Sequence, residues 1–358
     1  MDKQKYICWF KDIRKEDVSL VGGKGANLGE LKSINFPVPD GFVVTTETYR
    51  KFIEETGIKK KLKKIIDNIS NNAFTFDQTR KVSEELKKII KEAEVSQDIQ
   101  KMIIESYKML CSKEKPIGVA VRSSASEEDM EGASFAGQYE TLLNIKNEKS
   151  LISAIKECWS SAFGDRVIEY KTTKGINKDV DEMGVAVVIQ CMVNAETAGV
   201  MFTLDPRTGD RSKIVIEANW GLGESLVSGT VNPDYYIISK NPVRLIKMKI
   251  GEKAVFTAYS KEGVIEKETP IAQRKRPCLT EEKIISLAYL SKQIESHYKT
   301  PQDIEWAIEE KKDNSSSGLY ILQARSETVW SQKKEPKKKN NNKKSISKMA
   351  VQLKGFKF

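Results

Sequence analysis

The sequence contains a single histidine and no closely spaced cysteines, and these absences exclude several kinds of site. His297 lies near the end of a predicted helix, and one histidine cannot form a histidine-rich metal site. The five cysteines are scattered and include no CxxC pair, which argues against a disulfide framework or a structural zinc site. Cysteines without such partners are typical of the reducing cytoplasm, so we expect a cytoplasmic protein.

Long apolar segments are also missing. No apolar run approaches the roughly 20 residues that a membrane-spanning helix needs. The first residues contain no apolar stretch followed by a small-residue cleavage site, so we expect neither a membrane anchor nor an export signal. With 358 residues, of which 39% are hydrophobic and 31% are charged, the composition is that of a globular protein with two or three domains or lobes.

Positive charge is concentrated at one end of the chain. The net charge is +10, but the segment from Lys333 to Phe358 contains ten lysines and one acidic residue, which leaves +1 for the other residues. No motif that binds DNA or RNA accompanies these lysines, so we expect a solvated, disordered linker and no nucleic-acid partner. Apolar character returns at Met349–Phe358, and our hypothesis is that this end docks on a partner subunit.

Hydrophobic periodicity divides the body of the chain into a helical part and a strand-rich part. Apolar residues recur every three or four positions over Thr46–Leu110 and over Leu151–Lys171, which predicts helices. Beyond Asp181 the pattern predicts short strands, then a helix at Thr280–Tyr298 and a β-hairpin. We therefore expect an α/β (α+β) fold with an N-terminal lobe over residues 1–181, a C-terminal lobe over 182–330 and a lysine-rich tail over 331–358. The predicted strands of the C-terminal lobe are Val185–Ile189, Gly199–Thr203, Ile214–Ala218, Tyr235–Ile238 and Arg244–Ile250.

A glycine-rich turn, Gly22-Gly23-Lys24-Gly25, precedes a predicted helix. Glycines allow the backbone to approach a phosphate closely, the helix N-terminus favours an anion, and Lys24 adds a positive charge. The spacing is not that of a Walker A loop. A turn that only begins the helix explains the same residues, so both interpretations stay open.

Arg122 follows the predicted strand Ile117–Val121 and precedes a loop, Ser123–Tyr139, that is rich in serine, glycine and acidic residues. A guanidinium at the end of a strand can bind phosphate oxygens in a bidentate manner. An ion pair with the acidic residues at positions 127–129 explains the local pattern equally well.

A β-hairpin is predicted from two alternating strands, Asp303–Ile308 and Leu319–Ala324, joined by the polar loop Lys311–Gly318. Side chains alternate between the two faces of a strand. The apolar face of the first strand therefore holds Ile304, Trp306 and Ile308, and that of the second holds Tyr320, Leu322 and Ala324. If these apolar faces coincide, three polar side chains converge on the opposite face, namely Glu305, Gln323 and Arg325.

This polar face has the residue types of a site for a metal-bound phosphate. The carboxylate of Glu305 and the amide oxygen of Gln323 are hard ligands suited to Mg²⁺. The guanidinium of Arg325 can neutralise phosphate charge that the metal does not. The exposed polar face of an edge hairpin is the alternative interpretation.

Two other features of the strand-rich part are candidates for nucleotide contact. Val185–Met192 is a continuous apolar run, and such a strand between lobes can offer backbone groups to a purine, although it is more often plain core. Acidic and amide residues gather at strand ends around Asp205, Glu217 and Asn232, where open sheets usually place ligands.

Six motifs in this sequence occur in an order that resembles a known family. They resemble the N-terminal nucleotide-binding domain of the phosphoenolpyruvate synthases, which pyruvate phosphate dikinase and rifampin phosphotransferase share, over roughly residues 6–330. The motifs are VGGKGANLGEL, AVRSSASEEDMEGASFAGQYET, GVMFTLDP, EANWGLGESLVSGTVNPD, PQDIEWAIE and LYILQAR. Six motifs in family order are far more specific than any one of them.

The resemblance implies a two-lobed ATP-grasp fold that holds ATP and Mg²⁺ between its lobes. It implies that Lys24 and Arg122 contact the phosphates, that Arg325 lies at the transferring phosphates, and that Glu305 and Gln323 bind Mg²⁺. Positioning and electrostatics carry most of the catalysis in phosphoryl transfer, which suits such a site.

Further nucleotide contacts follow from the same resemblance. Gly23 belongs to the glycine-rich phosphate contact, and the segment Gln190–Met192 is the expected adenine hinge. Asp205 and Glu217 are assigned to the nucleotide from their positions within their motifs. Family members transfer the β-phosphoryl group of ATP to a histidine on a swivelling domain and release AMP, while the γ-phosphoryl group leaves separately.

The phosphorylated histidine of the family has no counterpart in this sequence. His297 lies in HYKTPQDIEW, which resembles the segment just before the metal-binding strand. We therefore expect the ATP-binding subunit of a dikinase that acts with a separate histidine-bearing subunit or domain and a small-molecule acceptor bound elsewhere. Phenylphosphate synthase, whose β subunit resembles this domain alone, is the model for that arrangement. A split or truncated phosphoenolpyruvate synthase and a catalytically idle nucleotide-sensing module are the alternatives.

Overall fold

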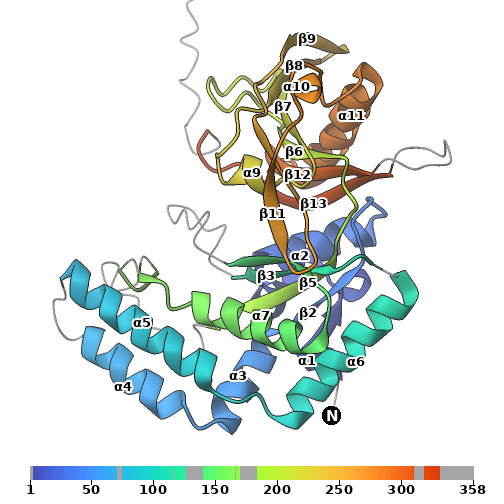
Figure 1. Ribbon diagram of the computed structural model, residues 1–358. Helices are drawn as coiled ribbons and strands as arrows, with labels where there is room; N and C mark the ends of the chain where they lie inside the picture. Colours follow the sequence, from blue (N-terminus) through green and yellow to red (C-terminus); the bar gives the residue numbers. More distant parts are fainter. Residues whose placement is uncertain are drawn as a thin grey trace, which may run out of the picture.

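The computed structural model describes residues 3–70, 75–114, 116–125, 140–165, 167–169, 184–309 and 318–330. Over these ranges the chain forms two lobes, each built on an antiparallel sheet, with a two-stranded hairpin beside them (Figure 1). This is the mixed α/β, two-lobed ATP-grasp-like fold that the sequence predicts. Within the same ranges no helix is both long and apolar enough to cross a membrane.

Several sequence-based expectations fall on residues that lie outside these ranges. They include the loop up to Tyr139 with its acidic positions 127–129, most of the polar loop Lys311–Gly318, and the lysine-rich tail with Met349–Phe358. The helix expected at Leu151–Lys171 begins at Glu148 and ends at Ser161.

The first lobe is a five-stranded sheet in the order β1-β2-β5-β3-β4. The helices expected over Thr46–Leu110 pack with α7 on one face of this sheet, where Phe52 and Trp159 stack with ring centroids 4.7 Å apart. Threonines 45 and 75 accept hydrogen bonds from the first turns of α3 and α5, which fixes where these helices begin. The strands are β1 (Ile7–Trp9), β2 (Gly41–Val44), β3 (Val119–Ser124), β4 (Thr141–Ile145) and β5 (Ala186–Cys191). The helices are α3 (Thr46–Glu55), α4 (Lys59–Ser70), α5 (Phe76–Glu92), α6 (Gln97–Glu114) and α7 (Glu148–Ser161).

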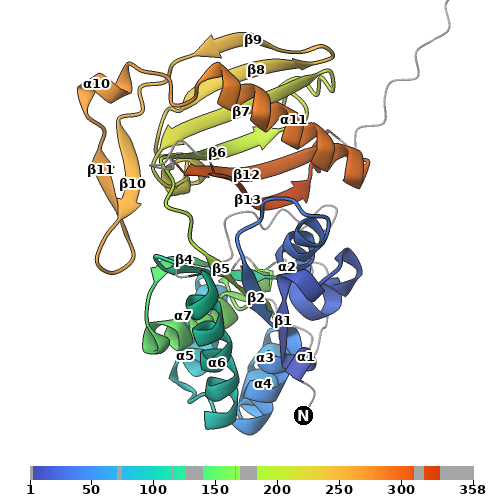
Figure 2. The ribbon, with the colours of Figure 1, turned by 90° about the vertical axis from the view of Figure 1, so that its right-hand side faces the viewer.

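Helix α2 (Val18–Ser33) lies on the opposite face of the first sheet, between the two lobes (Figure 2). It contacts β5 of the first lobe and β13 (Gly318–Ser326) of the second. Its buried residues Val21, Ala26 and Leu28 belong to a hydrophobic cluster that continues into the second sheet. The lobes therefore share part of one core. Three short helical segments precede α2, namely α1 (Lys3–Tyr6) and the 3₁₀ turns at Phe10–Asp12 and Lys15–Asp17.

The second lobe is a six-stranded sheet in the order β13-β12-β6-β7-β8-β9. Helix α11 (Glu281–Tyr298) begins at Thr280, whose side chain accepts a hydrogen bond from the amide of Lys283, and it covers one face of the sheet (Figure 2). The strands are β6 (Thr197–Phe202), β7 (Lys213–Trp220), β8 (Asp234–Lys240), β9 (Val243–Lys249), β12 (Gln302–Glu309) and β13. Two short helices, α9 (Glu224–Val227) and α10 (Ile271–Arg274), lie in the connections.

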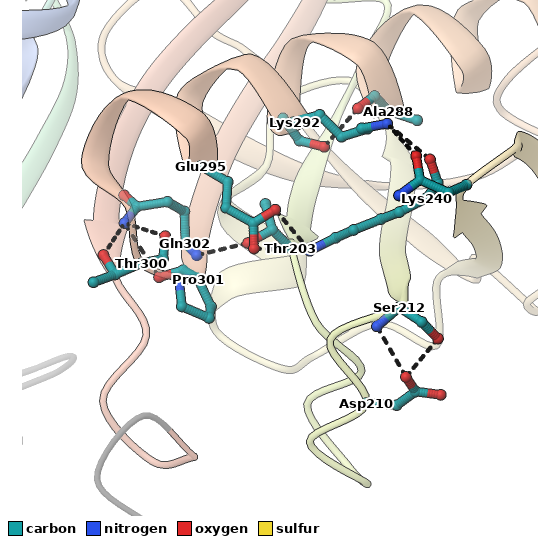
Figure 3. A network of polar contacts seen from close by, with 12 residues as sticks. Thr203, Asp210, Ser212, Lys240, Ala288, Lys292, Glu295, Thr300, Pro301 and Gln302 are labelled. Atoms are coloured by element: carbon teal, nitrogen blue, oxygen red, sulfur yellow. Dashed lines mark hydrogen bonds and ion pairs between the residues drawn. The ribbon is translucent and has the colours of Figure 1, made fainter.

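Polar contacts fix α11 and the start of β12 to their neighbours (Figure 3). The ammonium group of Lys240, at the end of β8, lies 2.7 and 2.6 Å from the two carboxylate oxygens of Glu295. The amide of Gln302 donates to the side-chain oxygen of Thr203 at 2.8 Å, which joins β12 to the end of β6. The helix thus closes one face of the sheet, and the face that bears Glu305 is directed toward the first lobe.

The change from the first sheet to the second comes later in the chain than residue 181. Strand β5 lies at the centre of the first sheet, between β2 and β3, and β6 belongs to the second. The connection between the lobes is therefore the segment at 192–196. Strand β5 is buried on both faces, with Val187 and Ile189 in one hydrophobic cluster and Ala186 and Val188 in the other, so its uniformly apolar sequence does not show which sheet it joins.

A hairpin of β10 (Val255–Tyr259) and β11 (Val264–Glu268), which was not predicted from the sequence, extends from the second lobe to the first. At its tip, the side-chain amide of Asn144 donates to the carbonyl oxygens of Ser260 and Gly263 at 3.0 and 2.6 Å. The hydroxyl of Tyr259 donates to the carbonyl of Val193 in the connection between the lobes. The hairpin is therefore a second bridge between the lobes.

The base of this hairpin is held by a fully buried ion pair between Asp234 and Lys253. One carboxylate oxygen of Asp234 accepts from the ammonium group at 2.5 Å and from the amide of Gly251 at 2.8 Å. The other accepts from the amide of Cys278 at 2.7 Å and from the hydroxyl of Tyr236 at 3.1 Å. A buried charge with so many partners is stable only as a complete set.

We predict that Asp234→Ala lowers the free energy of unfolding by about 3–5 kcal/mol, because it leaves the ammonium group of Lys253 buried without its counter-ion. Chemical denaturation monitored by tryptophan fluorescence measures the loss. Lys247→Met on the exposed part of β9 is the control and should change stability by less than about 0.5 kcal/mol. Equal unfolding midpoints for the two variants would show that the pair contributes nothing.

Candidate functional site

The side chain of Arg122 crosses from the first lobe to the second. One terminal nitrogen, Nη1, donates to the carbonyl of Leu322 at 2.9 Å. The other, Nη2, lies 2.9 Å from Oε2 of Glu305 and 2.5 Å from Oε1 of Gln323. Only 8% of Arg122 is exposed, and its contacts are charge-assisted, with that to Gln323 buried and those to Leu322 and Glu305 partly buried. The ion-pair partner of Arg122 in the described residues is therefore Glu305, on a different lobe.

The register of β12 and β13 places the predicted polar residues on one face. Glu305 lies directly opposite Gln323, and Asp303 lies directly opposite Arg325. The guanidinium of Arg325 contacts the carboxylate of Asp303 at 3.3 Å. The geometry thus brings Glu305 and Gln323 together, with Arg325 one pair further along the same face.

The apolar face of β13 differs from the expected one. The register shifts between Glu305 and Trp306, so that Trp306 pairs with Ile321 and Leu322 is the extra residue of a bulge. Tyr320 and Leu322 accordingly pack against Ala307 on the side of the site, not with the core under α11. The prediction assumed strict alternation, and a bulge reverses the faces beyond it.

The glycine-rich turn packs against the end of the strand that carries Arg122. The amide of Gly23 donates to the carbonyl of Ala125 at 3.0 Å, and the amide of Gly25 donates to the hydroxyl of Ser124 at 3.0 Å. Lys24 is buried, and its ammonium group donates to the carbonyl of Ser123 at 2.9 Å. Lys24 and Arg122 therefore leave neighbouring segments at the same end of β3.

Gln190 faces the same side of the first sheet as Arg122. It pairs with Ala120 across β5 and β3, two residues from the pair of Val188 and Arg122. Its side-chain nitrogen is buried and has no hydrogen-bond partner among the described residues. The amide of Met192 donates to the carbonyl of Gly118 at 3.0 Å. The side chain of Gln190 thus holds an unpaired donor, among the described residues, in the segment that we expect to bind adenine.

Glu217 lies on the same face of the second sheet as Glu305, two strands away, and Asp205 follows the end of β6. Burial opposes the ionisation of Asp205, but hydrogen bonds and charge from Arg207 outweigh it and lower the pKa of this carboxyl. Burial raises the pKa of Glu217, and Arg207 opposes that shift. The guanidinium of Arg207 lies 4.9 Å from the ring centroid of Tyr235, which pairs with Glu217. Asp205 and Tyr235 contact Arg207, and together with Glu217 these residues form a second polar group.

Glu305 and Gln323 also meet the chemical requirements of a magnesium site. Both oxygens converge on a single cationic nitrogen, so the hard donors already face one position. No group of three acidic, histidine or cysteine side chains in the described ranges could hold a metal on its own. Two protein oxygens suit Mg²⁺, which usually completes its shell with waters and substrate phosphates.

Comparison with known proteins shows what this arrangement is similar to. Residues 18–345 match the family described as pyruvate phosphate dikinase, AMP/ATP-binding domain. The chain belongs to this family. Because Arg122, Glu305 and Gln323 come from three strands of this AMP/ATP-binding domain, their contacts lie within the matched region.

Several curated relatives are phosphoenolpyruvate synthases from archaea. A probable phosphoenolpyruvate synthase of Methanothermobacter thermautotrophicus is 42% identical over 91% of this chain and 46% of the relative. One from Methanocaldococcus jannaschii is 40% identical over 94% of this chain and 28% of the relative. The phosphoenolpyruvate synthase of Aeropyrum pernix is 37% identical over 93% of this chain and 43% of the relative. The chain therefore spans about half the length of these relatives, or less.

Three residues beside the predicted site were not singled out from the sequence. Asp303 pairs with Arg325, and Arg207 pairs with Asp205 and lies over the ring of Tyr235, which is opposite Glu217. Desolvation raises the pKa of Glu224, and the negative charge of Glu305 adds to this effect. The alternation of Asp303 with Glu305 was a usable signal, whereas Arg207 and Glu224 depend on register and tertiary contact.

We predict that Gly22→Ala lowers the free energy of unfolding by about 2–5 kcal/mol, from backbone strain and overpacking together. Gly22 has a φ of 71°, and an added Cβ would lie 2.0 Å from the carbonyl oxygen of Ser124. Gly57→Ala is the matched control, because Gly57 has a φ of 67° and nothing within 4 Å of an added Cβ. It should lose only about 1–2 kcal/mol. Equal losses in thermal unfolding would contradict the close packing of this turn on β3.

Proposed function

We propose that this domain binds ATP with Mg²⁺ and donates the β-phosphoryl group to a histidine outside the present sequence. The observation that supports it best is the contact of Arg122 with Glu305 and Gln323. It joins a phosphate-binding residue type to two hard oxygen donors across the lobes. Membership of the AMP/ATP-binding family supports the nucleotide.

Each group in the site has a role in this proposal. Lys24 and Arg122 bind phosphate oxygens, and Arg325 stabilises the charge of the phosphoryl group in transfer. Glu305 and Gln323 hold Mg²⁺, which when bound neutralises phosphate charge and orients the chain of phosphates. Gln190 and the segment up to Met192 receive the adenine, with Gly23 at the phosphates.

The second polar group extends the site along the sheet. Glu217 lies on the face that carries Glu305, and Asp205 is paired with Arg207; we assign both carboxylates to the nucleotide or to the phosphoryl acceptor. Val200 lies between Glu305 and Glu217 in the register, so these two carboxylates are two strands apart. Adjacent strands lie about 4.8 Å apart. One extended ligand can therefore reach both carboxylates.

The acceptor histidine is not His297. Its ring nitrogen lies 2.8 Å from the carboxylate of Glu30, and it sits on α11 behind the sheet. We infer that the β-phosphoryl group passes to a histidine on a partner subunit or on another part of a longer chain, with release of AMP. Water then attacks the γ-phosphorus and breaks its bond to the oxygen of the β-phosphoryl group, so that the γ-phosphoryl group leaves as phosphate, and the histidine passes the remaining phosphoryl group to a small acceptor. The names of the relatives favour pyruvate over a phenol as that acceptor.

Calorimetric titration with ATP, with and without Mg²⁺, tests the nucleotide proposal directly. We expect Mg²⁺-dependent binding and little AMP release by the domain alone. Addition of a separately expressed histidine-bearing domain from a phosphoenolpyruvate synthase should start AMP formation. ATP binding with no metal dependence, and no AMP with that domain, would favour a nucleotide-sensing module instead.

We predict that Lys24→Ala weakens the binding of ATP by about 1.5–3 kcal/mol, the usual value of a hydrogen bond to a charged group. The binding of AMP should change much less, because AMP has no β- or γ-phosphate. Glu305→Ala should remove the effect of Mg²⁺ on ATP affinity, while Glu266→Ala on the exposed strand β11 should not. Calorimetry measures all three, and an unchanged Mg²⁺ effect in Glu305→Ala would refute the metal assignment.

A further inference from the structure

The two oxygens assigned to Mg²⁺ are already bound to a cation of the protein. Nη2 of Arg122 lies within hydrogen-bond distance of Oε2 of Glu305 and Oε1 of Gln323. A metal ion that took both oxygens as ligands would compete for the same lone pairs. It would also place a double positive charge beside the guanidinium in a poorly screened, buried position.

We propose that Arg122 is an internal cation that excludes Mg²⁺ from the nucleotide-free domain, so that the metal binds only together with a polyphosphate. This inference rests on the proposed function, since it concerns the same two metal ligands. Arg122 cannot give way by losing its charge, because a guanidinium stays protonated in proteins. It gives way by moving its terminal nitrogens to another anion.

The guanidinium has a donor that is ready for such an anion. Its Nε is buried and has no hydrogen-bond partner among the described residues. An unpaired buried donor is costly, and a phosphate oxygen placed beside it relieves that cost. A phosphate that accepts from Nε and a terminal nitrogen draws the guanidinium from Glu305 and Gln323, which are then free to take the metal.

The exchange makes metal and nucleotide binding mutually dependent. Each ligand raises the affinity for the other by the same factor, because the coupling is reciprocal. A ligand without β- and γ-phosphates, such as AMP, does not release Arg122 and does not admit the metal. Whether the metal can bind thus depends on whether Arg122 contacts Glu305 and Gln323 or a phosphate of the nucleotide.

Equilibrium dialysis with Mn²⁺ alone as the probe tests the exclusion. Mn²⁺ prefers the same oxygen ligands as Mg²⁺. We expect the wild type and Arg122→Lys, which keeps the positive charge, to bind Mn²⁺ weakly without nucleotide. Arg122→Met should bind it about tenfold or more tightly, and Glu305→Gln added to Arg122→Met should abolish the gain. Lys247→Met, which removes one charge from an exposed position of β9, is the control and should match the wild type.

A second arm uses the wild type and needs no variant. A non-hydrolysable ATP analogue, present on both sides of the membrane to balance chelation, should raise the affinity of the protein for Mn²⁺ about 5- to 150-fold, and AMP should not. Tight Mn²⁺ binding by the nucleotide-free wild type, or no gain in a folded Arg122→Met, overturns the inference. If Arg122→Met does not fold, the experiment with the ATP analogue decides. An equal effect of AMP on the affinity for Mn²⁺ then contradicts the inference. Failure of the proposed function is seen separately, as absence of ATP binding in calorimetry.

Discussion

A buried arginine needs acceptors for its donors, and Arg122 finds its acceptors on the opposite lobe. The carbonyl of Leu322 and the side chains of Glu305 and Gln323 are the only groups that hold its terminal nitrogens in the described residues. The bulge at Leu322 lies within this set, next to Gln323. The bulge of β13, the facing pair of Glu305 and Gln323 and a contact between the two sheets therefore meet at one side chain.

The two faces of the second sheet differ in composition and in what they contact. One face packs against α11 through Ile304, Trp306 and Ile308 and is apolar. The other carries Glu305, Glu217 and their polar neighbours toward the first lobe. Because alternate residues of each strand serve different purposes, substitutions one position apart in β12 have unrelated effects.

Much of this arrangement could be predicted from the sequence, and the exceptions have physical causes. Alternation in β12 located Glu305, and periodicity located α3–α6 and α11, because both signals are local. The bulge at Leu322, the hairpin at 255–268 and the place of β5 in the first sheet could not be seen, since each depends on pairing between distant segments. The contact of Arg122 with Glu305 spans 183 positions, and no local pattern indicates it. The roles of all the predicted site residues in binding nucleotide and metal stay predictions, including those of Arg122, Glu305 and Gln323.

The hairpin of β10 and β11 has a mechanical consequence for the domain. Its base is fixed in the second lobe by Asp234 and Lys253, and its tip is hydrogen-bonded to Asn144 of the first. The chain at 192–196 joins the lobes at another point. A body attached at one point can swing in any direction, but a body attached at two points turns only about the line between them. Any rotation of one lobe against the other that keeps both attachments is therefore confined to the line between them, and it also has to part the core that the lobes share around α2.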